Sequence, residues 1–216
     1  MRARKKKHAD ERIAACSEYL IKDNTENKGA WKCFFEERNG TCNGIALEIG
    51  CGKGTFVTTL AKQNPDICFV AIERVKDVLV MALEKAKNEC LNNLVFMNAD
   101  AANLPEYFGE EELDNIYLNF PDPWHKERHS KRRLTAPSFL RLYREVLKED
   151  GAIFFKTDND PLFEFSLITF EEEKYVLKNV TFDLHKEEPD WNVRTEYEST
   201  FSEKGFKIKR LEAWLK

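Results

Sequence analysis

The chain has 216 residues, of which 42% are hydrophobic and 33% are charged, and its net charge is −4. This composition indicates one soluble domain with a substantial core, and no run approaches the ~18 apolar residues that a membrane span requires. The basic start of the chain is followed by no apolar stretch, so we expect no secretory signal and a cytoplasmic protein. Six cysteines without a C-x-x-C pair are expected to be reduced.

Residues 1–43 are expected to form an N-terminal extension, with a basic tail at residues 2–7 and a short helix over residues 9–20 outside the main fold. Two alternatives stay open for the tail, since it either contacts RNA or only aids solubility. Residues 44–216 are predicted to form a single α/β domain, because strands and helices alternate from residue 44 onwards.

The most informative segment is residues 45–62. An apolar run over residues 45–49 predicts a buried strand, and G-x-G-x-G over residues 50–54 predicts a tight turn before a helix. A dinucleotide fingerprint would place its last glycine where Thr55 stands. Glu48 would repel a pyrophosphate but attract an ammonium or sulfonium group. Glu73 lies about 20 residues further on, where such folds bind ribose hydroxyls. The segment therefore favours S-adenosylmethionine over a dinucleotide.

The remaining elements follow in alternation. Strands are predicted over residues 69–72, 94–98, 113–120 and 151–157. Helices are predicted over residues 75–90, 136–147 and 160–174, with Thr135 as the N-cap of the second. Residues 175–185 and 206–215 are expected to add an antiparallel pair to a parallel sheet. Acids follow five strands, and a doubly wound sheet would gather them at its carboxyl edge, where ligands bind: Glu48, Glu73, Asp100, Asp122 and Asp158.

Residues 119–126 read N-F-P-D-P-W-H-K. Two prolines fix the backbone on both sides of Asp122, so its carboxylate should point in a set direction at the end of a strand. The cations that follow offer contacts to RNA phosphates, with a solvated basic loop as the alternative. They are Lys126, Arg128, Lys131, Arg132 and Arg133. His125 and His129 are four residues apart, but no third ligand is near, so no metal site is expected.

These motifs, together with K-T-D at residues 156–158 and T-E-Y-E at residues 195–198, resemble those of the bacterial tRNA (guanine-N7-)-methyltransferase family. The resemblance implies a Rossmann-like class I methyltransferase fold, with a mostly parallel seven-stranded sheet, a C-terminal antiparallel strand and helices on both faces. It also implies transfer of a methyl group from S-adenosyl-L-methionine to N7 of guanine(46) in the tRNA variable loop, leaving S-adenosyl-L-homocysteine. The partner is then tRNA, and the protein is a monomer or a homodimer.

The resemblance assigns roles to individual residues. The matching cofactor-binding acids are Glu48, Glu73, Asp100 and Asp122, beside the loop glycines Gly50, Gly52 and Gly54. Asp122 is also the candidate catalytic residue. The matching substrate-binding positions are Lys126, Asp158, Thr195, Glu196, Tyr197 and Glu198. The charge pattern, by contrast, is what predicts that Arg128, Lys131, Arg132 and Arg133 contact the RNA backbone.

The expected chemistry agrees with this inventory. Guanine N7 carries a lone pair and no proton, so attack on a sulfonium methyl needs alignment more than a strong base. The methylated base is cationic, and facing carboxylates would stabilise that charge. We therefore hypothesise that Asp158, Glu196 and Glu198 bind the guanine edge while Asp122 orients the base or the cofactor. The base is expected to be drawn out of the folded tRNA.

Two other readings remain open. P-D-P-W is similar to the Asn/Asp-Pro-Pro-aromatic signature of amino-group methyltransferases, although here an acid separates the prolines. The chain could also be a non-catalytic RNA-binding module on the same fold, but the intact Glu48, Gly50, Gly52 and Glu73 argue against this.

Overall fold

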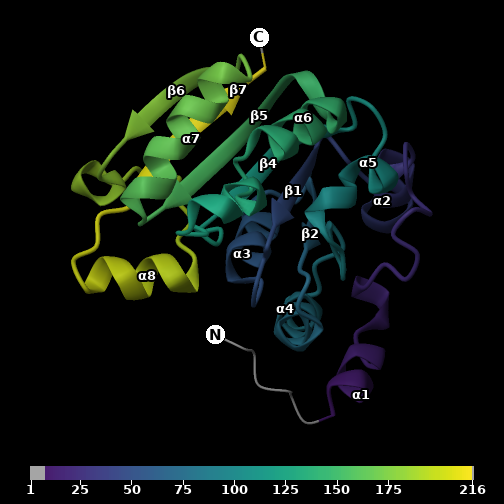
Figure 1. Ribbon diagram of the computed structural model, residues 1–216. Helices are drawn as coiled ribbons and strands as arrows, with labels where there is room; N and C mark the ends of the chain where they lie inside the picture. The colour runs from purple at the N-terminus through teal and green to yellow at the C-terminus, as the bar shows by residue number, and fades with distance from the viewer. Residues whose placement is uncertain (1–7, 216) are drawn as a thin grey trace.

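A twisted seven-stranded sheet runs through the centre of the protein, with strand order β3-β2-β1-β4-β5-β7-β6 (Figure 1). The structure, a computed structural model, describes residues 8–215. β7 runs antiparallel to both of its neighbours, β5 and β6, and the pairs among β1 to β5 are parallel, which confirms the predicted fold class and the C-terminal pair. The strands are β1 (Ile45–Ile49), β2 (Cys68–Ile72), β3 (Leu94–Met97), β4 (Leu113–Asn119), β5 (Leu147–Thr157), β6 (Val176–Thr181) and β7 (Lys209–Trp214).

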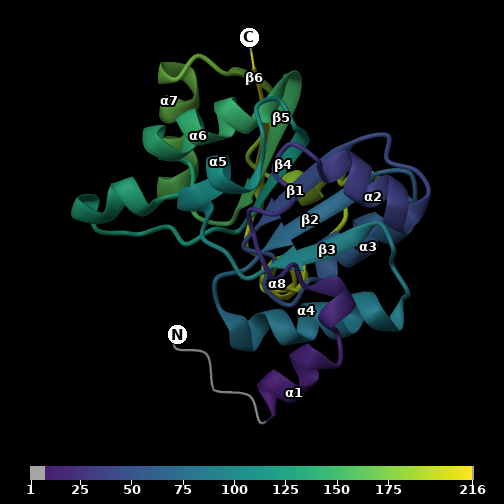
Figure 2. The same cartoon turned by 90° about the vertical axis from the view of Figure 1, so that its right-hand side faces the viewer.

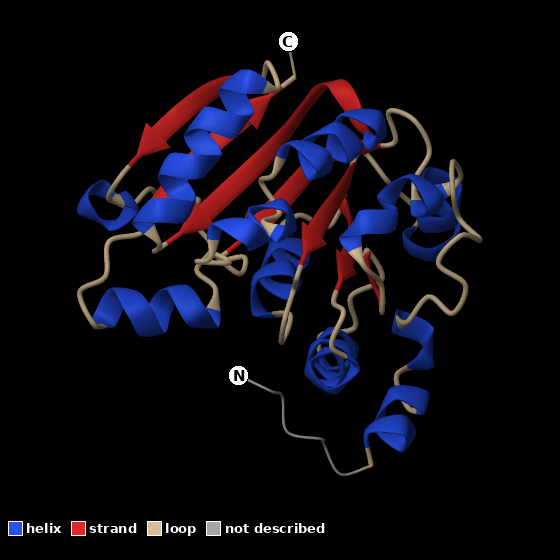
Figure 3. Cartoon of the chain, viewed as in Figure 1, coloured by secondary structure: helices blue, strands red, loops and turns tan. Residues whose placement is uncertain are grey.

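The sheet is covered by helices on both faces (Figures 2 and 3). One face packs against α2 (Trp31–Asn39), α5 (Leu104–Tyr107), α6 (Pro137–Val146) and α7 (Asp160–Glu172). The other packs against α3 (Thr55–Gln63) and α4 (Lys76–Asn88), with α1 (Ala9–Ala14) lying on α4. Because β1, β2 and β3 are enclosed on both sides, every residue in them is buried, as their apolar runs predict, and Glu48 in β1 is the one charged residue among them.

The N-terminal region packs more closely onto the domain than the sequence indicates. Trp31 and Phe35 are fully buried in the main core. Leu20 forms a parallel bridge to Phe96, and the Arg12 guanidinium bonds Glu84 of α4 with both distances at 2.6 Å. The predicted boundary at residue 43 therefore coincides with no change in packing. The basic tail at residues 2–7 lies outside the described residues.

Two local predictions are wrong, and one helix was not predicted. Thr135 does not cap α6, because its hydroxyl lies 2.7 Å from the Ser166 hydroxyl and the helix begins after Ala136 with a proline at its first position. The helix expected over residues 9–20 ends at Ala14 and is followed by a 3-10 turn. Residues 196–203 form a helix, α8 (Glu196–Glu203), that was not predicted at all. No helix within residues 8–215 has the length and apolar character needed to cross a bilayer.

Candidate active site

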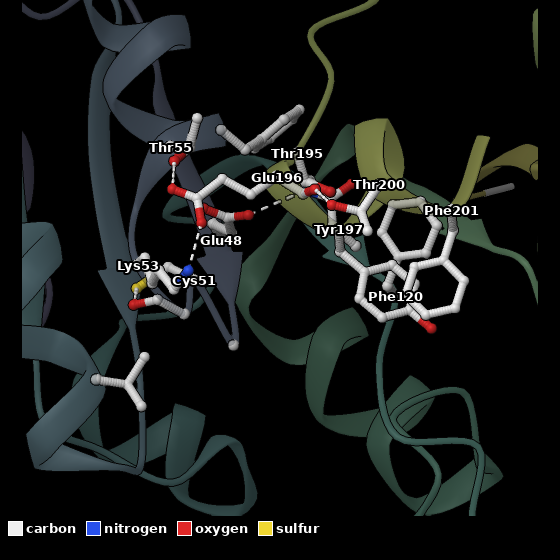
Figure 4. A pocket seen from close by; sticks show the side chains of 15 residues that line it. Glu48, Cys51, Lys53, Thr55, Phe120, Thr195, Glu196, Tyr197, Thr200 and Phe201 are labelled. Carbon is white, nitrogen blue, oxygen red and sulfur yellow. Dashed lines mark hydrogen bonds and ion pairs between the residues drawn. The ribbon is translucent and has the colours of Figure 1, made fainter. Parts of the chain in front are cut away.

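The strand order reverses between β1 and β4, and a cavity of about 470 Å³ opens at the carboxyl ends of these two strands. Its walls come from the glycine loop after β1, the end of β4 and the first turns of α8 (Figure 4). A switch point of this kind is where open α/β sheets bind ligands, since the two adjacent loops leave in opposite directions. The five acids predicted at this edge do lie at the carboxyl ends of β1 to β5: Glu48 is the penultimate residue of β1, and the other four follow β2, β3, β4 and β5.

The glycine loop is shaped by backbone contacts. Gly50, Gly52 and Gly54 all have positive φ, and a Cβ on Gly54 would lie 2.6 Å from the Cβ of Ala82 in α4. The Glu73 carboxylate accepts hydrogen bonds from the amides of Gly52 at 3.1 Å and Val75 at 2.8 Å. Glu73 therefore holds the glycine loop, which follows β1, in place.

Glu48 is a buried acid in the lining of the cavity. It is 3% exposed, and its Oε1 accepts a hydrogen bond from Asn119 Nδ2 at 3.0 Å. Its Oε2 is buried and has no hydrogen-bond partner among the described residues. Burial raises the pKa of Glu48 to about 7, against the opposing effects of Asn119 and Lys156. A buried acid with one oxygen left unbonded suits a cationic ligand group.

α8 closes the opposite side of the cavity through Glu196. The Glu196 carboxylate accepts from Lys53 Nζ at 2.8 Å and Thr55 Oγ1 at 2.7 Å (Figure 4). It also accepts from Lys85 Nζ at 2.7 Å. The hydrogen bonds from Lys53 and Lys85 lower the pKa of Glu196 to about 2. Its carboxylate therefore links α8 to the glycine loop, α3 and α4.

Next to Glu196, the aromatic ring of Tyr197 stacks on Phe201 with centroids 4.0 Å apart and lies 5.0 Å from Phe120. The Tyr197 hydroxyl donates to Asp158 Oδ2 at 3.3 Å. The cavity is therefore bordered by three aromatic rings, and Asp158 lies behind one of them.

Glu198 holds α8 in place from inside the protein. It is fully buried and forms a capping box with Thr195, and its carboxylate accepts from Lys156 Nζ at 2.9 Å and from Asn192 Nδ2 at 3.0 Å. His185 Nε2 lies 2.9 Å from the same carboxylate. Burial acts to raise the pKa of Glu198, but Lys156, Asn192 and His185 together lower it. This burial does not fit the predicted role of Glu198 in binding guanine, because every contact it makes is internal to the fold.

His185, Glu188 and Glu198 bring one possible ligand atom each within 4.8 Å of one another. Lys156 and Arg194 already pair with the two carboxylates, so the cluster is an internal ion-pair network. Of the two histidines considered as metal ligands in the sequence, His129 has its ring edge-on to Trp124, with centroids 5.7 Å apart.

The comparisons with known proteins agree with this geometry. A family model described as "Putative methyltransferase" matches residues 43–211. The tRNA (guanine-N(7)-)-methyltransferase of Clostridioides difficile is 49% identical, covering 99% of this chain and 98% of that protein. The protein of the same name from a Geobacillus species is 48% identical, with 98% and 94% covered. The chain belongs to this methyltransferase family.

Solved structures show the same class I methyltransferase fold for this family member. The 16S rRNA methyltransferase KamB superimposes with a TM-score of 0.64 at 17% identity, covering 84% of this chain and 92% of that one. A structure titled as an antibiotic-related methyltransferase gives a TM-score of 0.63 at 18% identity, with the same coverage. At this level of identity, the likeness concerns the fold.

The predicted site residues of this methyltransferase fall into three groups, with Asp100 and Arg133 outside them. Those that line the cavity are Glu48, Gly50, Gly52, Thr195, Glu196 and Tyr197. Those that support its walls are Gly54, Glu73, Asp158 and Glu198. Asp100 accepts from the amide of Ala102 and pairs with Arg74. Those on the exposed loop after β4 are Asp122, Lys126, Arg128, Lys131 and Arg132, while Arg133 is buried.

Several residues of the site were missed from the sequence. Asn119 bonds the key acid, Lys53 and Lys85 bond Glu196, and Phe120 and Phe201 line the cavity. A signal for α8 was present, because Thr195 and Glu198 have the S/T-x-x-E spacing of a capping box. The lysine contacts had no comparable signal, since they join segments more than 100 residues apart.

Proposed function

We propose that this chain is a tRNA (guanine-N7-)-methyltransferase that acts on guanine(46) of the variable loop. The observation that supports this most directly is the buried carboxylate of Glu48, which has one oxygen without a hydrogen-bond partner among the described residues and belongs to the lining of a cavity at the switch point of a methyltransferase fold. A protein acting on tRNA is expected to work in the cytoplasm. The family membership of the chain supports the choice of tRNA guanine as substrate.

The residues around the cavity fit S-adenosyl-L-methionine. When bound, it supplies an electrophilic methyl group. Glu48 would attract its cationic methionine end, and the glycine loop leaves room for close approach of the backbone. Glu73 has lone pairs left after its two amide contacts, and these would accept ribose hydroxyls. Asp100, after β3, would bind the adenosine end.

The exposed loop after β4 would present the RNA. Asp122 follows Phe120, which lines the cavity, by two residues, so its carboxylate would face a base that enters beside that ring. N7 of guanine needs no deprotonation, so the role of Asp122 is to orient the base and stabilise the positive charge that develops. Lys126 would contact the substrate, and Arg128, Lys131 and Arg132 the phosphates.

A methyl-transfer assay on unmodified tRNA transcripts tests the proposal. We expect incorporation into a wild-type transcript and none after the variable-loop guanosine is replaced by adenosine. The product should be cleaved at that site after borohydride and aniline treatment, as N7-methylguanosine is. Methylation of an exocyclic amine instead would favour the amino-group alternative. Failure to bind S-adenosylhomocysteine in calorimetry would favour a non-catalytic RNA-binding module.

Replacing Asp122 by Asn tests the role given to that residue. The carboxylate charge is lost while the shape is kept, so kcat should fall by roughly a hundredfold, as for loss of one electrostatic contact to a transition state. The affinity for S-adenosylhomocysteine should change little, because Asp122 does not line the cavity. Unchanged kcat in Asp122→Asn would remove this residue from the mechanism.

A further inference from the structure

One of the five cations that follow the P-D-P-W motif differs from the other four. The side chain of Arg133 is only 8% exposed, whereas Lys126, Arg128, Lys131 and Arg132 are all exposed. A phosphate contact requires an accessible guanidinium, so the burial of Arg133 does not fit the RNA contact predicted from the charge pattern.

The guanidinium of Arg133 points back at the loop that carries Asp122. Its Nε donates to the carbonyl of Pro123 at 3.1 Å, and its Nη2 donates to the carbonyl of Trp124 at 3.3 Å. The guanidinium carbon of Arg133, Cζ, lies 4.3 Å from the centroid of the Phe165 ring in α7. Arg133 therefore fastens the two residues directly after Asp122 to a helix of the main fold.

The backbone at this loop needs such a restraint. Phe120 has φ +51° and Trp124 has φ +43°, so the residues on either side of P-D-P both adopt the left-handed conformation. This conformation is costly for an aromatic residue and persists only where surrounding contacts enforce it. Arg132, whose guanidinium lies 4.9 Å from the Trp124 ring, adds a contact to the side chain but none to the backbone.

We propose that Arg133 is a positioning residue for methyl transfer: it fixes the backbone after Asp122, so that this carboxylate is presented beside Phe120 at the cavity. Arg133 itself contacts neither RNA nor cofactor. The inference rests on the proposed function, because it takes Asp122 as the residue that faces the target base.

Replacing Arg133 by a neutral residue and by a charged residue distinguishes a positioning role of Arg133 from binding of an RNA phosphate. In Arg133→Gln we expect kcat to fall by roughly tenfold to a hundredfold, as for a misplaced reacting group. The slope of log tRNA affinity against log salt should stay unchanged. Arg128→Gln, at an exposed cation of the same segment, should reduce that slope by about 0.9. Arg133→Lys keeps the charge but lacks the planar fork that reaches two carbonyls, so kcat should fall here as well. A slope reduced by about 0.9 in Arg133→Gln, or an undiminished kcat in both variants, would overturn the proposal.

Two further measurements guard against a general loss of folding. Phe165→Leu removes the platform under the guanidinium without changing charge, and should lower kcat in the same direction as Arg133→Lys. In an Asp122→Asn background, Arg133→Lys should cost little more, because both changes act through one carboxylate. Additive losses would contradict the proposal. Arg141→Lys, at an exposed arginine on α6 paired with Glu173, is the matched control and should leave kcat unchanged.

Amide hydrogen exchange over residues 120–126 gives a readout that does not depend on activity. Exchange should be faster in Arg133→Gln and Arg133→Lys and unchanged in Arg141→Lys. If the wild-type protein transfers no methyl group, the proposed function fails alone, because exchange and salt dependence still report on Arg133. Exchange that is the same in all variants would overturn the positioning role.

Discussion

Glu48 is the buried carboxylate in the lining of the cavity. Its carboxylate is removed from water, receives one hydrogen bond from Asn119 and leaves one oxygen without a partner. The sequence indicated a ligand role for Glu48 because it stands near the end of a predicted buried strand, two residues before the first glycine. The hydrogen bond from Asn119 to Glu48 could not be predicted from the sequence. Asn119 lies 71 residues further along the chain, in β4, and only the fold places β4 next to β1.

The raised pKa of Glu48 predicts pH-dependent ligand binding. Because the carboxyl of the unliganded protein holds its proton up to about pH 7, a cationic ligand meets a neutral acid below that value. The affinity for S-adenosylhomocysteine should therefore fall by roughly tenfold between pH 7.5 and pH 6.0. Calorimetry across this range should show the change in the wild type and in the surface control Glu106→Gln, and a flat profile in Glu48→Gln.

The same shift predicts the stability of the unliganded protein. A carboxyl whose pKa is raised on folding weakens the fold as pH rises from about 4.5 through about 7. At pH 8 the cost reaches roughly 3 kcal/mol, so unliganded Glu48→Gln should resist urea better than the wild type there. At pH 4 the two proteins should unfold at similar urea concentrations. A less stable Glu48→Gln at pH 8 would show that the carboxylate has a compensating partner.

Among the residues of α8, only Glu198 is buried. The helix is fixed at its start by the capping box of Thr195 and Glu198, and by the buried ion pair to Lys156 in β5. Its outer contact, from Glu196 to two lysines, lies at half-exposed groups, where ion pairs contribute little. The position of α8 over the cavity therefore depends mainly on its first turn.

Thr195→Ala tests this dependence. Loss of the cap should cost about 1 kcal/mol and lower Tm by about 2–4 °C for a chain of this size. The affinity for S-adenosylhomocysteine should fall as well, because α8 lines the cavity. Thr195→Ser retains the hydroxyl that accepts the amide of Glu198 and should behave like the wild type. Equal losses in both variants would mean that the methyl group, and not the cap, holds the helix.

The sequence specified the central sheet well and its connections less well. Apolar runs such as residues 45–49 and 69–72 determine buried strands almost by themselves, because only enclosed parallel strands are apolar on both faces. Residues 196–203 are mainly polar, so no hydrophobic period revealed α8. Thr135 was misread because its hydroxyl bonds Ser166, a partner that only tertiary packing supplies.

For the whole molecule, the distribution of charge matters more than its sum. The net charge of −4 would repel nucleic acid if it were spread evenly. The exposed cations Lys126, Arg128, Lys131 and Arg132 all belong to the connection after β4, at the same end of the sheet as the cavity. RNA is therefore expected to approach this end.

Because these exposed cations lie at one end of the sheet, replacing cations at that end should change the salt dependence of tRNA binding, and replacing cations elsewhere should not. The combined replacement of Arg128 and Lys131 by Gln should weaken tRNA binding and reduce the salt slope by about 2, since two phosphate contacts are lost. Lys28→Gln changes an exposed cation next to Gly29, which borders the amino ends of β1 and β4, and should leave the slope unchanged. Filter binding between 50 and 200 mM salt, the range over which such effects are large, measures both. Equal slopes in the three proteins would place the RNA elsewhere.

β7 is synthesised after β5 and β6, yet it lies between them in the sheet. A chain leaves the ribosome amino end first, so β5 and β6 wait with open edges until residues 209–214 have been translated. Open strand edges readily join those of other chains. A chain truncated before residue 209 would therefore give a self-associating product and not a shorter enzyme.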